Sequence, residues 1–312
     1  MTRAFVFPGQ GAQTIGMGRA LADAYPAARA VFAEVDAALG EALSALIWEG
    51  DIAALTLTEN AQPALMATSM AAMAALQAEG IGIYHADFVA GHSLGEYSAL
   101  CAAGALSLSD TARLLRIRGR AMQQAVPVGV GAMAALLGLD LAAATAVAAE
   151  AAQGEVCQAA NDNDPAQVVI SGHKGAVERA LEIAKAHGAK RALLLPVSAP
   201  FHCVLMQPAA AVMSDALAAV VIERPLVPVV VNVRAEAVTE PDRIRDLLVA
   251  QITGAVRWRE SVLWMERAGV VEFWEIGAGK ALSGMIKRIA AGAATRAIGT
   301  AEDVVAAKAA AV

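Results

Sequence analysis

The sequence predicts an α/β protein in which a mostly parallel sheet forms the core and a smaller α/β subdomain is inserted. Short β-type runs alternate with helical patterns up to about residue 127, and the same alternation resumes after about residue 200. This alternation is typical of a parallel sheet that helices cover on both faces. The chain has 312 residues, of which 57% are hydrophobic and 17% charged, enough for one large core or two unequal cores.

In the larger part, the expected strands are short apolar runs, as is typical of strands buried on both faces. They lie at residues 4–7, 87–90, 229–233 and 270–276. Helical patterns follow each of them. The first extends to residue 39, and the others lie at residues 64–78, 96–124, 241–251 and 280–290. We therefore expect the strands to form one sheet whose connections are helical.

Between Pro127 and Pro196 the order of elements changes, which predicts a separate subdomain. The expected order is strand, helix, strand, strand, helix, strand, at residues 133–137, 141–152, 156–160, 167–171, 176–187 and 192–195. This β-α-β-β-α-β order is the ferredoxin-like pattern. Because Pro and Gly mark both ends, we divide the chain into a large α/β core, residues 1–127 and 198–312, and a small ferredoxin-like subdomain, residues 128–197.

Charge and cysteine content exclude several classes of protein. Lys and Arg number 24 against 30 Asp and Glu, so no broad surface for nucleic acid or an anionic membrane is expected. Cys101, Cys157 and Cys203 are too few for a disulfide framework or a CxxC metal site, which indicates a reducing, cytoplasmic compartment. The longest uncharged stretches are interrupted by Gln, Pro or Gly, so no membrane span is expected either.

We expect no cofactor and no metal ion. Gly277-Ala278-Gly279-Lys280 lacks the upstream glycine of a P-loop and the third glycine of a dinucleotide-binding fingerprint. The sequence also contains no HExxH pattern and no Cys/His cluster that would indicate a metal site.

A candidate nucleophile, Ser93, lies in Gly91-His92-Ser93-Leu94-Gly95, which fits the pattern G-x-S-x-G. An expected strand precedes the motif and a helical pattern follows it, which is the context that this chemistry requires. A serine on such a sharp strand-to-helix turn exposes its hydroxyl, and the next N–H and the positive end of the helix can stabilise an oxyanion. The alternative is a tight structural turn whose serine has no chemical role.

The favoured base for Ser93 is His202, because it lies in an irregular segment where the chain re-enters the large core. A capping or core histidine is the alternative. His92 adjoins Ser93 and should point to the other side of the turn. Cys203 directly follows His202 and should face away, so we do not favour it as a nucleophile. The remaining histidines lie at a loop end or beside a helix of the small subdomain, where we expect them to be solvated: His85, His173 and His187.

Arg118 is predicted to project into the apolar side of its helix. At about 100° per residue, Arg113, Arg116 and Arg120 share a solvated face within roughly 60°, whereas Arg118 projects about 140° from Arg113. A buried guanidinium without an anion costs on the order of 3 to 5 kcal/mol, so Arg118 needs a carboxylate. That carboxylate belongs either to an internal Asp or Glu or to a substrate gripped by two hydrogen bonds.

Further motifs follow in order across nearly the whole chain. They are Phe7-Pro8-Gly9-Gln10-Gly11, Gly91-His92-Ser93-Leu94-Gly95-Glu96, Arg118-Gly119, Asn161 with Gln167-Val168-Val169-Ile170-Ser171-Gly172, Pro200-Phe201-His202, and Gln251 followed by Val256 and Trp258. Together they resemble the malonyl-CoA:acyl carrier protein transacylases, which load malonyl units in fatty acid and polyketide synthesis. The combination is far more specific than G-x-S-x-G alone.

The resemblance implies an α/β-hydrolase-like parallel-sheet core with a ferredoxin-like subdomain, in agreement with the order of elements. It implies that Ser93 is acylated, that His202 is base and acid, and that the main-chain carbonyl of Gln251 orients His202. It also implies the remaining roles: Gln10 and the Leu94 N–H for the oxyanion hole, Arg118 for the malonyl carboxylate, Asn161 for the cleft between the two parts, and Phe201, which favours an unbranched acyl group.

The implied reaction moves a malonyl group from coenzyme A to the phosphopantetheine thiol of acyl carrier protein through a malonyl-serine intermediate. The coenzyme A thioester is a substrate, so no cofactor is implied, and we expect a cytoplasmic monomer. A serine thioesterase or esterase is the alternative, and a non-enzymatic protein that kept the fold is a third reading. By charge alone, candidate docking residues for an acidic carrier are Lys190, Arg191, Lys280, Lys287 and Arg288; ordinary surface charges are the alternative.

Overall fold

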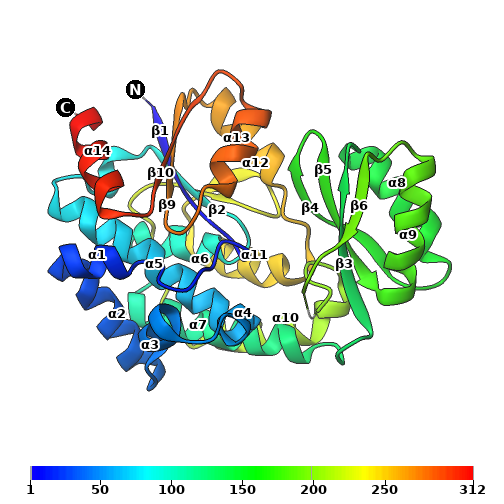
Figure 1. Ribbon diagram of the computed structural model, residues 1–312, viewed down its shortest axis with the longest axis horizontal. Helices are drawn as coiled ribbons and strands as arrows, with labels where there is room; N and C mark the ends of the chain where they lie inside the picture. Colours follow the sequence, from blue (N-terminus) through cyan, green and yellow to red (C-terminus); the bar gives the residue numbers. More distant parts are fainter. Residues whose placement is uncertain (1, 198, 312) are drawn as a thin grey trace.

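The computed structural model describes residues 2–197 and 199–311, which form a larger part and a smaller lobe (Figure 1). Ser198, where we predicted that the chain re-enters the larger part, lies outside the described residues. The larger part contains a six-stranded sheet and the smaller lobe a four-stranded sheet. The prediction of an α/β protein with a parallel-sheet core is confirmed.

The larger sheet has the strand order β10-β9-β1-β2-β7-β8, and every pairing is parallel except that of β7 with β8. Along β1 (Arg3–Phe7), Ala4 and Val6 belong to one face of the sheet, Phe5 and Phe7 to the other, and all four are buried. Apolar residues on both faces fit a sheet that helices cover on both sides. The other strands are β2 (Phe88–Gly91), β7 (Val229–Val231), β8 (Glu236–Val238), β9 (Glu272–Ile276) and β10 (Ala294–Ile298).

The face of Ala4 and Val6 packs against α12 (Trp258–Arg267) and α13 (Ala281–Ile289). The opposite face packs against the thicker helical layer that forms most of the core: α1 (Arg19–Ala24), α2 (Pro26–Leu39), α3 (Leu43–Glu49), α4 (Ile52–Thr56), α5 (Thr58–Ala78), α6 (Gly95–Ala102), α7 (Leu108–Gln124), α10 (Gln207–Ala218), α11 (Pro241–Thr253) and α14 (Ala301–Ala311). Two short 3₁₀ turns are η1 (Ile83–His85) and η2 (Val204–Met206). In the part of the chain that the structure describes, no helix is both long and apolar enough to cross a membrane.

The helical pattern predicted at 96–124 forms two helices, α6 and α7. Gly104, with a φ of 74°, allows the left-handed backbone that ends the first segment. Ser107 then caps α7, because its hydroxyl oxygen accepts a hydrogen bond from the Asp110 N–H at 3.0 Å. This break gives α6 and α7 separate directions, so that both a turn at Ser93 and a side chain from α7 can reach one site.

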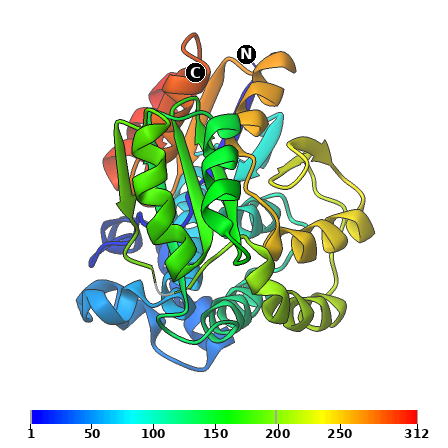
Figure 2. The same cartoon turned by 90° about the vertical axis from the view of Figure 1, so that its right-hand side faces the viewer.

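The smaller lobe follows the predicted order of elements. It contains β3 (Gly131–Leu137), α8 (Leu141–Ala152), β4 (Cys157–Asp164), β5 (Gln167–His173), α9 (Lys174–Ala186) and β6 (Arg191–Leu194). Its strands pair antiparallel in the order β4-β5-β3-β6. One face packs on α8 and α9, which lie in front of the strands in Figure 2, while Met133 and Val169 on the other face join the larger core. The two parts therefore share a buried boundary.

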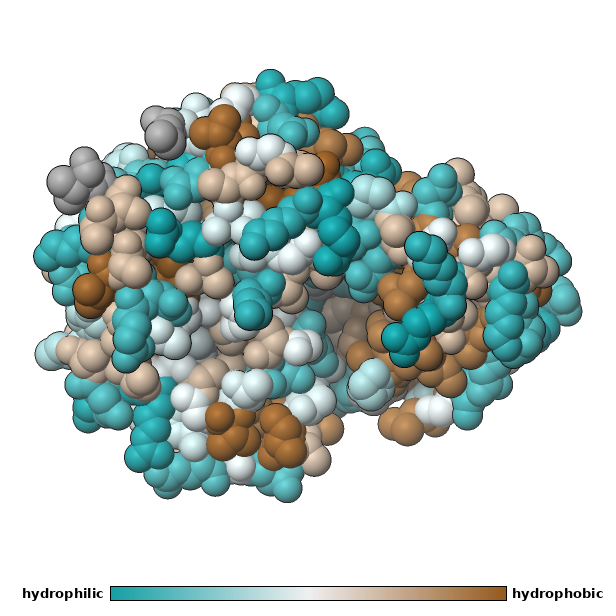
Figure 3. All heavy atoms as spheres, turned by 45° about the horizontal axis from the view of Figure 1, so that its top comes forward, coloured by the Kyte–Doolittle hydropathy of each residue, from teal (hydrophilic) through white to brown (hydrophobic). Residues whose placement is uncertain are grey.

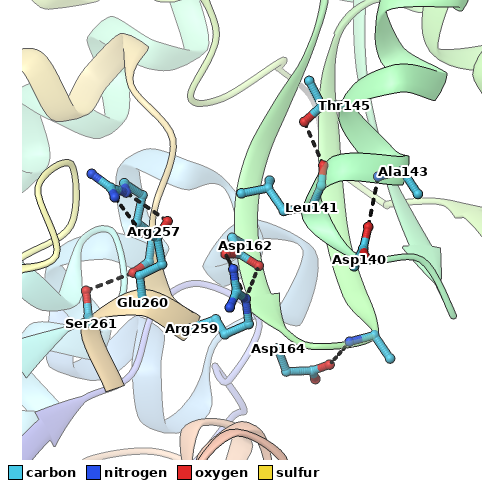
Figure 4. A network of polar contacts seen from close by, with 11 residues as sticks. Asp140, Leu141, Ala143, Thr145, Asp162, Asp164, Arg257, Arg259, Glu260 and Ser261 are labelled. Atoms are coloured by element: carbon cyan, nitrogen blue, oxygen red, sulfur yellow. Dashed lines mark hydrogen bonds and ion pairs between the residues drawn. The ribbon is translucent and has the colours of Figure 1, made fainter. Parts of the chain in front are cut away.

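Strand β4 attaches the lobe to the larger part. The N–H of Asp162 donates to the carbonyl oxygen of Val256 at 2.9 Å, and the Val256 N–H donates back to β4 at 2.8 Å. Asp162 also pairs with Arg259 of α12 at 2.9 Å, as Figure 4 shows, and Asp164 pairs with Arg288 of α13 at 2.7 Å. Both carboxylates are buried, and ion pairs of this kind fix geometry. This edge of the lobe is therefore held firmly against α12 and α13.

Candidate active site

Ser93 lies on a sharp turn between β2 and α6. Its φ of 54° is left-handed, which is uncommon for a residue other than glycine and is found at strained functional turns. A Cβ on Gly91 would lie 1.9 Å from the backbone of Gly95, and a Cβ on Gly95 would lie 2.2 Å from the carbonyl oxygen of Phe7. Since no side chain fits at either position, the turn depends on both glycines.

His202 is a hydrogen-bond partner of Ser93, 109 positions away in the sequence. Its Nε2 lies 2.8 Å from Ser93 Oγ, and its Nδ1 lies 2.9 Å from the main-chain oxygen of Gln251. Because that carbonyl can only accept, Nδ1–H donates to it, which leaves Nε2 to accept from the Ser93 hydroxyl. Burial, together with the charge of Arg118, lowers the pKa of His202 to about 3, so the ring is neutral at pH 7. This arrangement can remove a proton from Ser93.

Arg118 points from α7 into the same site and is only 1% exposed. Its Nη2 donates to Ser93 Oγ at 3.1 Å and to Gln251 Oε1 at 2.9 Å, and its Nη1 donates to Gln62 Oε1 at 2.7 Å. These acceptors are neutral, and among the described residues no carboxylate lies within 4.0 Å of the guanidinium nitrogens. Of the two alternatives, an internal Asp or Glu as the ion-pair partner of Arg118 is therefore not found among the described residues. The site presents a buried cation beside Ser93, which favours an external carboxylate as its partner.

A cavity of about 370 Å³ lies beside these residues, a volume typical of sites for small molecules. Seven of the eight predicted site residues line it, and Gln251 lies buried behind His202. Figure 3 shows that the surface is hollowed between the larger part and the smaller lobe. The lining comes from both parts: Gln10, Gly11, Gln13, Thr56, Gln62, His92, Ser93, Leu94, Arg118, Met122, Phe201 and His202, and from the lobe and its exit Met133, Asn161, Leu195, Pro196 and Val197.

The other predicted residues surround Ser93 at this cavity. Leu94 precedes the first turn of α6, where N–H groups have no acceptor within the helix and can bind an anion. The side-chain amide of Gln10 donates to the Thr58 hydroxyl at 3.3 Å. Asn161 on β4 and Phe201 beside His202 are both buried at the cavity wall. The cavity thus brings together residues from five of the six motifs, and Gln251, from the sixth, contacts His202.

Asn232, which was not predicted to belong to the site, holds the turn of Ser93 through its side-chain amide. Its Oδ1 accepts from the Ser93 N–H at 2.8 Å, and its Nδ2 donates to the Gly91 carbonyl oxygen at 2.7 Å. Asn232 directly follows β7, the neighbour of β2 in the sheet. Its place at the carboxyl end of a parallel strand is the one signal that could have identified it.

Glu96 also received no role from the sequence, although it ends one of the motifs. Its side chain is buried on the first turn of α6, and its Oε2 accepts from the Asn232 N–H at 2.8 Å and from Gln251 Nε2 at 3.0 Å. Its Oε1 has no hydrogen-bond partner among the described residues. Burial raises the pKa of Glu96 to about 7. A carboxyl group whose ionisation is opposed by burial thus lies directly behind the site.

The prediction that Arg116 lies on a solvated face is wrong. Arg116 is 6% exposed, pairs with Glu41, and donates from Nη1 to the carbonyl oxygen of Glu59 at 2.8 Å. The first turn of α5 and the segment before α3 cover this side of α7. Arg113 and Arg120, expected on the same face, are exposed.

Two other candidates for chemistry at the turn make different contacts. His92 lines the cavity rather than pointing away from it, and its Nε2 lies 2.9 Å from Asn163 Oδ1. Cys203 is buried, and its Sγ donates to the carbonyl oxygen of Pro200 at 3.2 Å. All three cysteines are free thiols. Over the described ranges 2–197 and 199–311, no His, Cys, Asp or Glu side chains form a group that could hold a metal ion.

Comparison with known proteins identifies relatives along almost the entire chain. The family model described as the acyl transferase domain matches residues 4–286. The malonyl CoA-acyl carrier protein transacylase of Escherichia coli (strain K12) is 50% identical over 286 residues, which cover 92% of this chain and 92% of that protein. The protein of the same name from Bacillus subtilis (strain 168) is 50% identical over 287 residues, which cover 92% and 90%.

Solved structures agree with these matches. An acyl-carrier-protein-S-malonyltransferase from Bartonella henselae is 54% identical and superposes with a TM-score of 0.97, covering 100% of this chain and 99% of that chain. A malonyl-transacylase solved in complex with a type II PKS acyl-carrier protein is 42% identical and has a TM-score of 0.96, covering 99% of each chain.

Proposed function

Because the chain belongs to the family of malonyl-CoA:acyl carrier protein transacylases, we propose that it transfers a malonyl group from coenzyme A to the phosphopantetheine thiol of acyl carrier protein. The names of its relatives support the donor and the acceptor. The observation that supports the acyl group is Arg118, a buried cation that pairs with no carboxylate of residues 2–197 and 199–311 and lies 3.1 Å from the hydroxyl of Ser93. The product supplies malonyl units for fatty acid or polyketide synthesis.

In the first half-reaction, Ser93 Oγ attacks the thioester carbonyl carbon of malonyl-CoA while His202 Nε2 takes the hydroxyl proton. The Leu94 N–H, at the positive end of α6, and Gln10 stabilise the oxyanion of the tetrahedral intermediate. The carbon–sulfur bond then breaks, and the coenzyme A sulfur takes the proton from His202 and leaves as a thiol. The malonyl group remains as an ester of Ser93.

In the second half-reaction, the carrier's phosphopantetheine thiol takes the place of coenzyme A. His202 accepts the thiol proton, the sulfur attacks the ester carbonyl, and the carbon–oxygen bond to Ser93 breaks. Ser93 Oγ recovers the proton from His202, and malonyl leaves as a thioester of the carrier. The main-chain carbonyl of Gln251 holds the His202 ring in one tautomer throughout. Both substrates supply their own sulfur, so the steps need no cofactor.

The malonyl carboxylate binds Arg118 through two hydrogen bonds. An acetyl group would leave the guanidinium without an anion, a penalty of about 2 to 5 kcal/mol. Phe201, buried at the cavity wall, supports an unbranched acyl group, and Asn161 lines the cavity from the smaller lobe. The acyl group selected is therefore a short dicarboxylic half-thioester.

The test is a transfer assay with malonyl-CoA, acetyl-CoA and a phosphopantetheine-loaded carrier protein. We expect malonyl to accumulate on the carrier and intact-mass analysis to detect malonyl on the enzyme. Release of free malonate without loading of the carrier would instead indicate a serine thioesterase. Absence of any acylated enzyme would indicate a protein that kept the fold without the activity.

We further propose that the larger part is an α/β-hydrolase-like core, residues 1–127 and 198–312, and that residues 128–197 form a ferredoxin-like subdomain. The strand-turn-helix around Ser93 supports the first assignment. The order β-α-β-β-α-β and the antiparallel sheet order β4-β5-β3-β6 support the second. In this arrangement the active site lies between the two units, so the subdomain supplies one wall of it.

For the acidic carrier protein, we propose docking on four exposed basic residues, Lys190, Arg191, Lys280 and Lys287. Arg288, predicted with them, already pairs with the buried Asp164 and contributes less. Charge reversal of the four exposed residues should raise the apparent KM for carrier at low salt, and an unchanged KM would contradict the assignment. The free cysteines support a cytoplasmic location, and a monomer remains our prediction, to be checked by analytical ultracentrifugation.

A further inference from the structure

Behind the groups proposed to touch the substrate lies a buried chain of carboxylate, amide and guanidinium. Glu96 Oε2 accepts a hydrogen bond from Gln251 Nε2 at 3.0 Å, and Gln251 Oε1 accepts one from Arg118 Nη2 at 2.9 Å. All three side chains are buried. Glu96 and Arg118 form no ion pair themselves, so the Gln251 amide is the direct link between them.

These two neighbours permit only one orientation of the Gln251 amide. An amide has a donor end and an acceptor end, whereas a guanidinium only donates and a carboxylate only accepts. If the amide were turned over, its NH₂ would face the guanidinium of Arg118 and its oxygen would face the carboxylate of Glu96. Both contacts would then be repulsive in a buried site, where unpaired polar groups are most costly. Gln251 Nε2 also donates to the Ser93 carbonyl oxygen at 3.1 Å and to Asn232 Oδ1 at 3.3 Å. Glu96, which lies nearest to Nε2 at 3.0 Å and carries the carboxylate, is thus the main acceptor that keeps the Gln251 oxygen turned towards Arg118.

The orientation of the amide in turn determines where the guanidinium lies. Gln251 Oε1 holds Nη2, and Gln62 Oε1 holds Nη1 at 2.7 Å, so two acceptors fix the plane of the Arg118 group. Nε has no partner among the described residues. A guanidinium has five N–H donors. Gln62, Gln251 and Ser93 accept from three of them, so donors remain for an external carboxylate. The arrangement directs a fixed cation at the hydroxyl of Ser93.

We infer that Glu96 is a positioning residue for malonyl selection, which acts through the side-chain amide of Gln251 to hold Arg118 beside Ser93. This inference rests on the proposed malonyl transfer. The role inferred for the Gln251 side chain differs from the role of Gln251 toward His202, because the latter uses the main-chain carbonyl and does not depend on the side chain. Loss of Glu96 should therefore reduce transfer of acyl groups that carry a carboxylate more than transfer of those that do not.

The test compares kcat/KM for malonyl-CoA with that for acetyl-CoA in three variants. Glu96→Ala removes the acceptor, and Gln251→Met removes the amide while keeping the main-chain carbonyl. Each should lower the malonyl-to-acetyl ratio by about tenfold or more, the effect of one hydrogen bond to a charged group. The conservative Glu96→Gln keeps an acceptor oxygen and should restore most of the ratio. The double variant Glu96→Ala with Gln251→Met should be no worse than the more affected single variant, because both act through one chain.

Glu275→Ala is a matched control. Glu275 is the other buried glutamate whose oxygens accept N–H groups, from Leu282 at 3.0 Å and from Ser283 at 2.7 Å, at the start of α13. These contacts support the fold, and none of them involves the proposed active site. We expect Glu275→Ala to lower the midpoint of thermal unfolding without changing the malonyl-to-acetyl ratio.

Equal losses for both acyl groups in Glu96→Ala would mean that Glu96 only supports the fold, and the inference would be wrong. If Glu96→Ala does not fold, an unchanged ratio in Gln251→Met would overturn the inference on its own. A wild-type protein that loads no malonyl would instead refute the proposed function. If the wild type loads malonyl and Arg118→Met loses malonyl selectively while Gln251→Met does not, then only the present inference fails.

Discussion

Replacement of Arg118 by methionine tests the choice of acyl group most directly. Methionine fills much of the same volume and removes a cation that is 1% exposed and whose hydrogen-bond acceptors in the described part of the chain, at 2.7 to 3.1 Å, are all neutral. A bound malonyl carboxylate would then be buried without its cation, and loss of one partner of a buried ion pair costs about 3 to 5 kcal/mol. At about 1.4 kcal/mol per tenfold change in rate, kcat/KM for malonyl-CoA should fall by about 10² to 10⁴.

The same change should lower kcat/KM for acetyl-CoA by less than about tenfold, because acetyl makes no ion pair that could be lost. Arg116→Met is the matched control, since Arg116 is a second buried arginine of α7 whose contacts lie outside the cavity. It should lower stability and leave the malonyl-to-acetyl ratio unchanged. The assay measures initial rates of carrier loading at several concentrations of each thioester. Equal losses of both activities in Arg118→Met would refute the assignment of this side chain to the acyl carboxylate.

Three further predictions follow from the geometry of the site. Ser93→Ala should abolish acylation by malonyl-CoA, and a malonyl ester detected by intact mass in that variant would contradict the nucleophile. Since the pKa of His202 is lowered to about 3, protonation of this ring should not change the acylation rate between pH 5 and 8. If NMR detected protonation of His202 in that range, and the acylation rate changed with it, the neutral ring would be contradicted. The pKa of Glu96 is raised from 4.5 to about 7, so between these pH values the native state keeps a proton that the unfolded state has released. The unfolding free energy should therefore fall by about 3 kcal/mol as the pH rises through this range. Denaturant titrations at pH 5 and 8 should show this loss in the wild type and not in Glu96→Gln; the same loss in the variant would contradict it.

Local patterns were sufficient where neighbours in the sequence are also neighbours in space. The run before Gly91 and the helical pattern after Gly95 predicted the turn of Ser93, because strand, turn and helix all lie within a dozen residues. The helical period also predicted the burial of Arg118, since the apolar stripe of α7 is a property of that helix alone. In both cases the residues that determine the structure lie within one or two elements.

Contacts between distant segments were not predictable in the same way. The helical period placed Arg116 on the solvated face of its helix. The period gives the direction in which a side chain projects, but it cannot show that Glu41 and the start of α5 cover that face. Asn232 meets Ser93 only because β7 pairs with β2 in the sheet, and nothing in the local sequence around Asn232 indicates this pairing. The resemblance to a family identified Gln251 through its main chain, while its side-chain contacts come from Arg118 on α7, Glu96 on α6, Ser93 and Asn232.

Burial of these side chains explains several properties of the site through one cause. Burial keeps His202 neutral and therefore able to accept a proton, and the same burial opposes ionisation of Glu96. In a medium of low dielectric constant, charges interact over longer distances than in water. When ionised, Glu96, one amide away from Arg118, therefore offsets part of the guanidinium charge in the free protein without accepting any of its N–H groups. A directly bound carboxylate would stabilise Arg118 more strongly but would also compete with the substrate. The interposed amide of Gln251 keeps the cation stable enough to remain buried and still available to an incoming carboxylate.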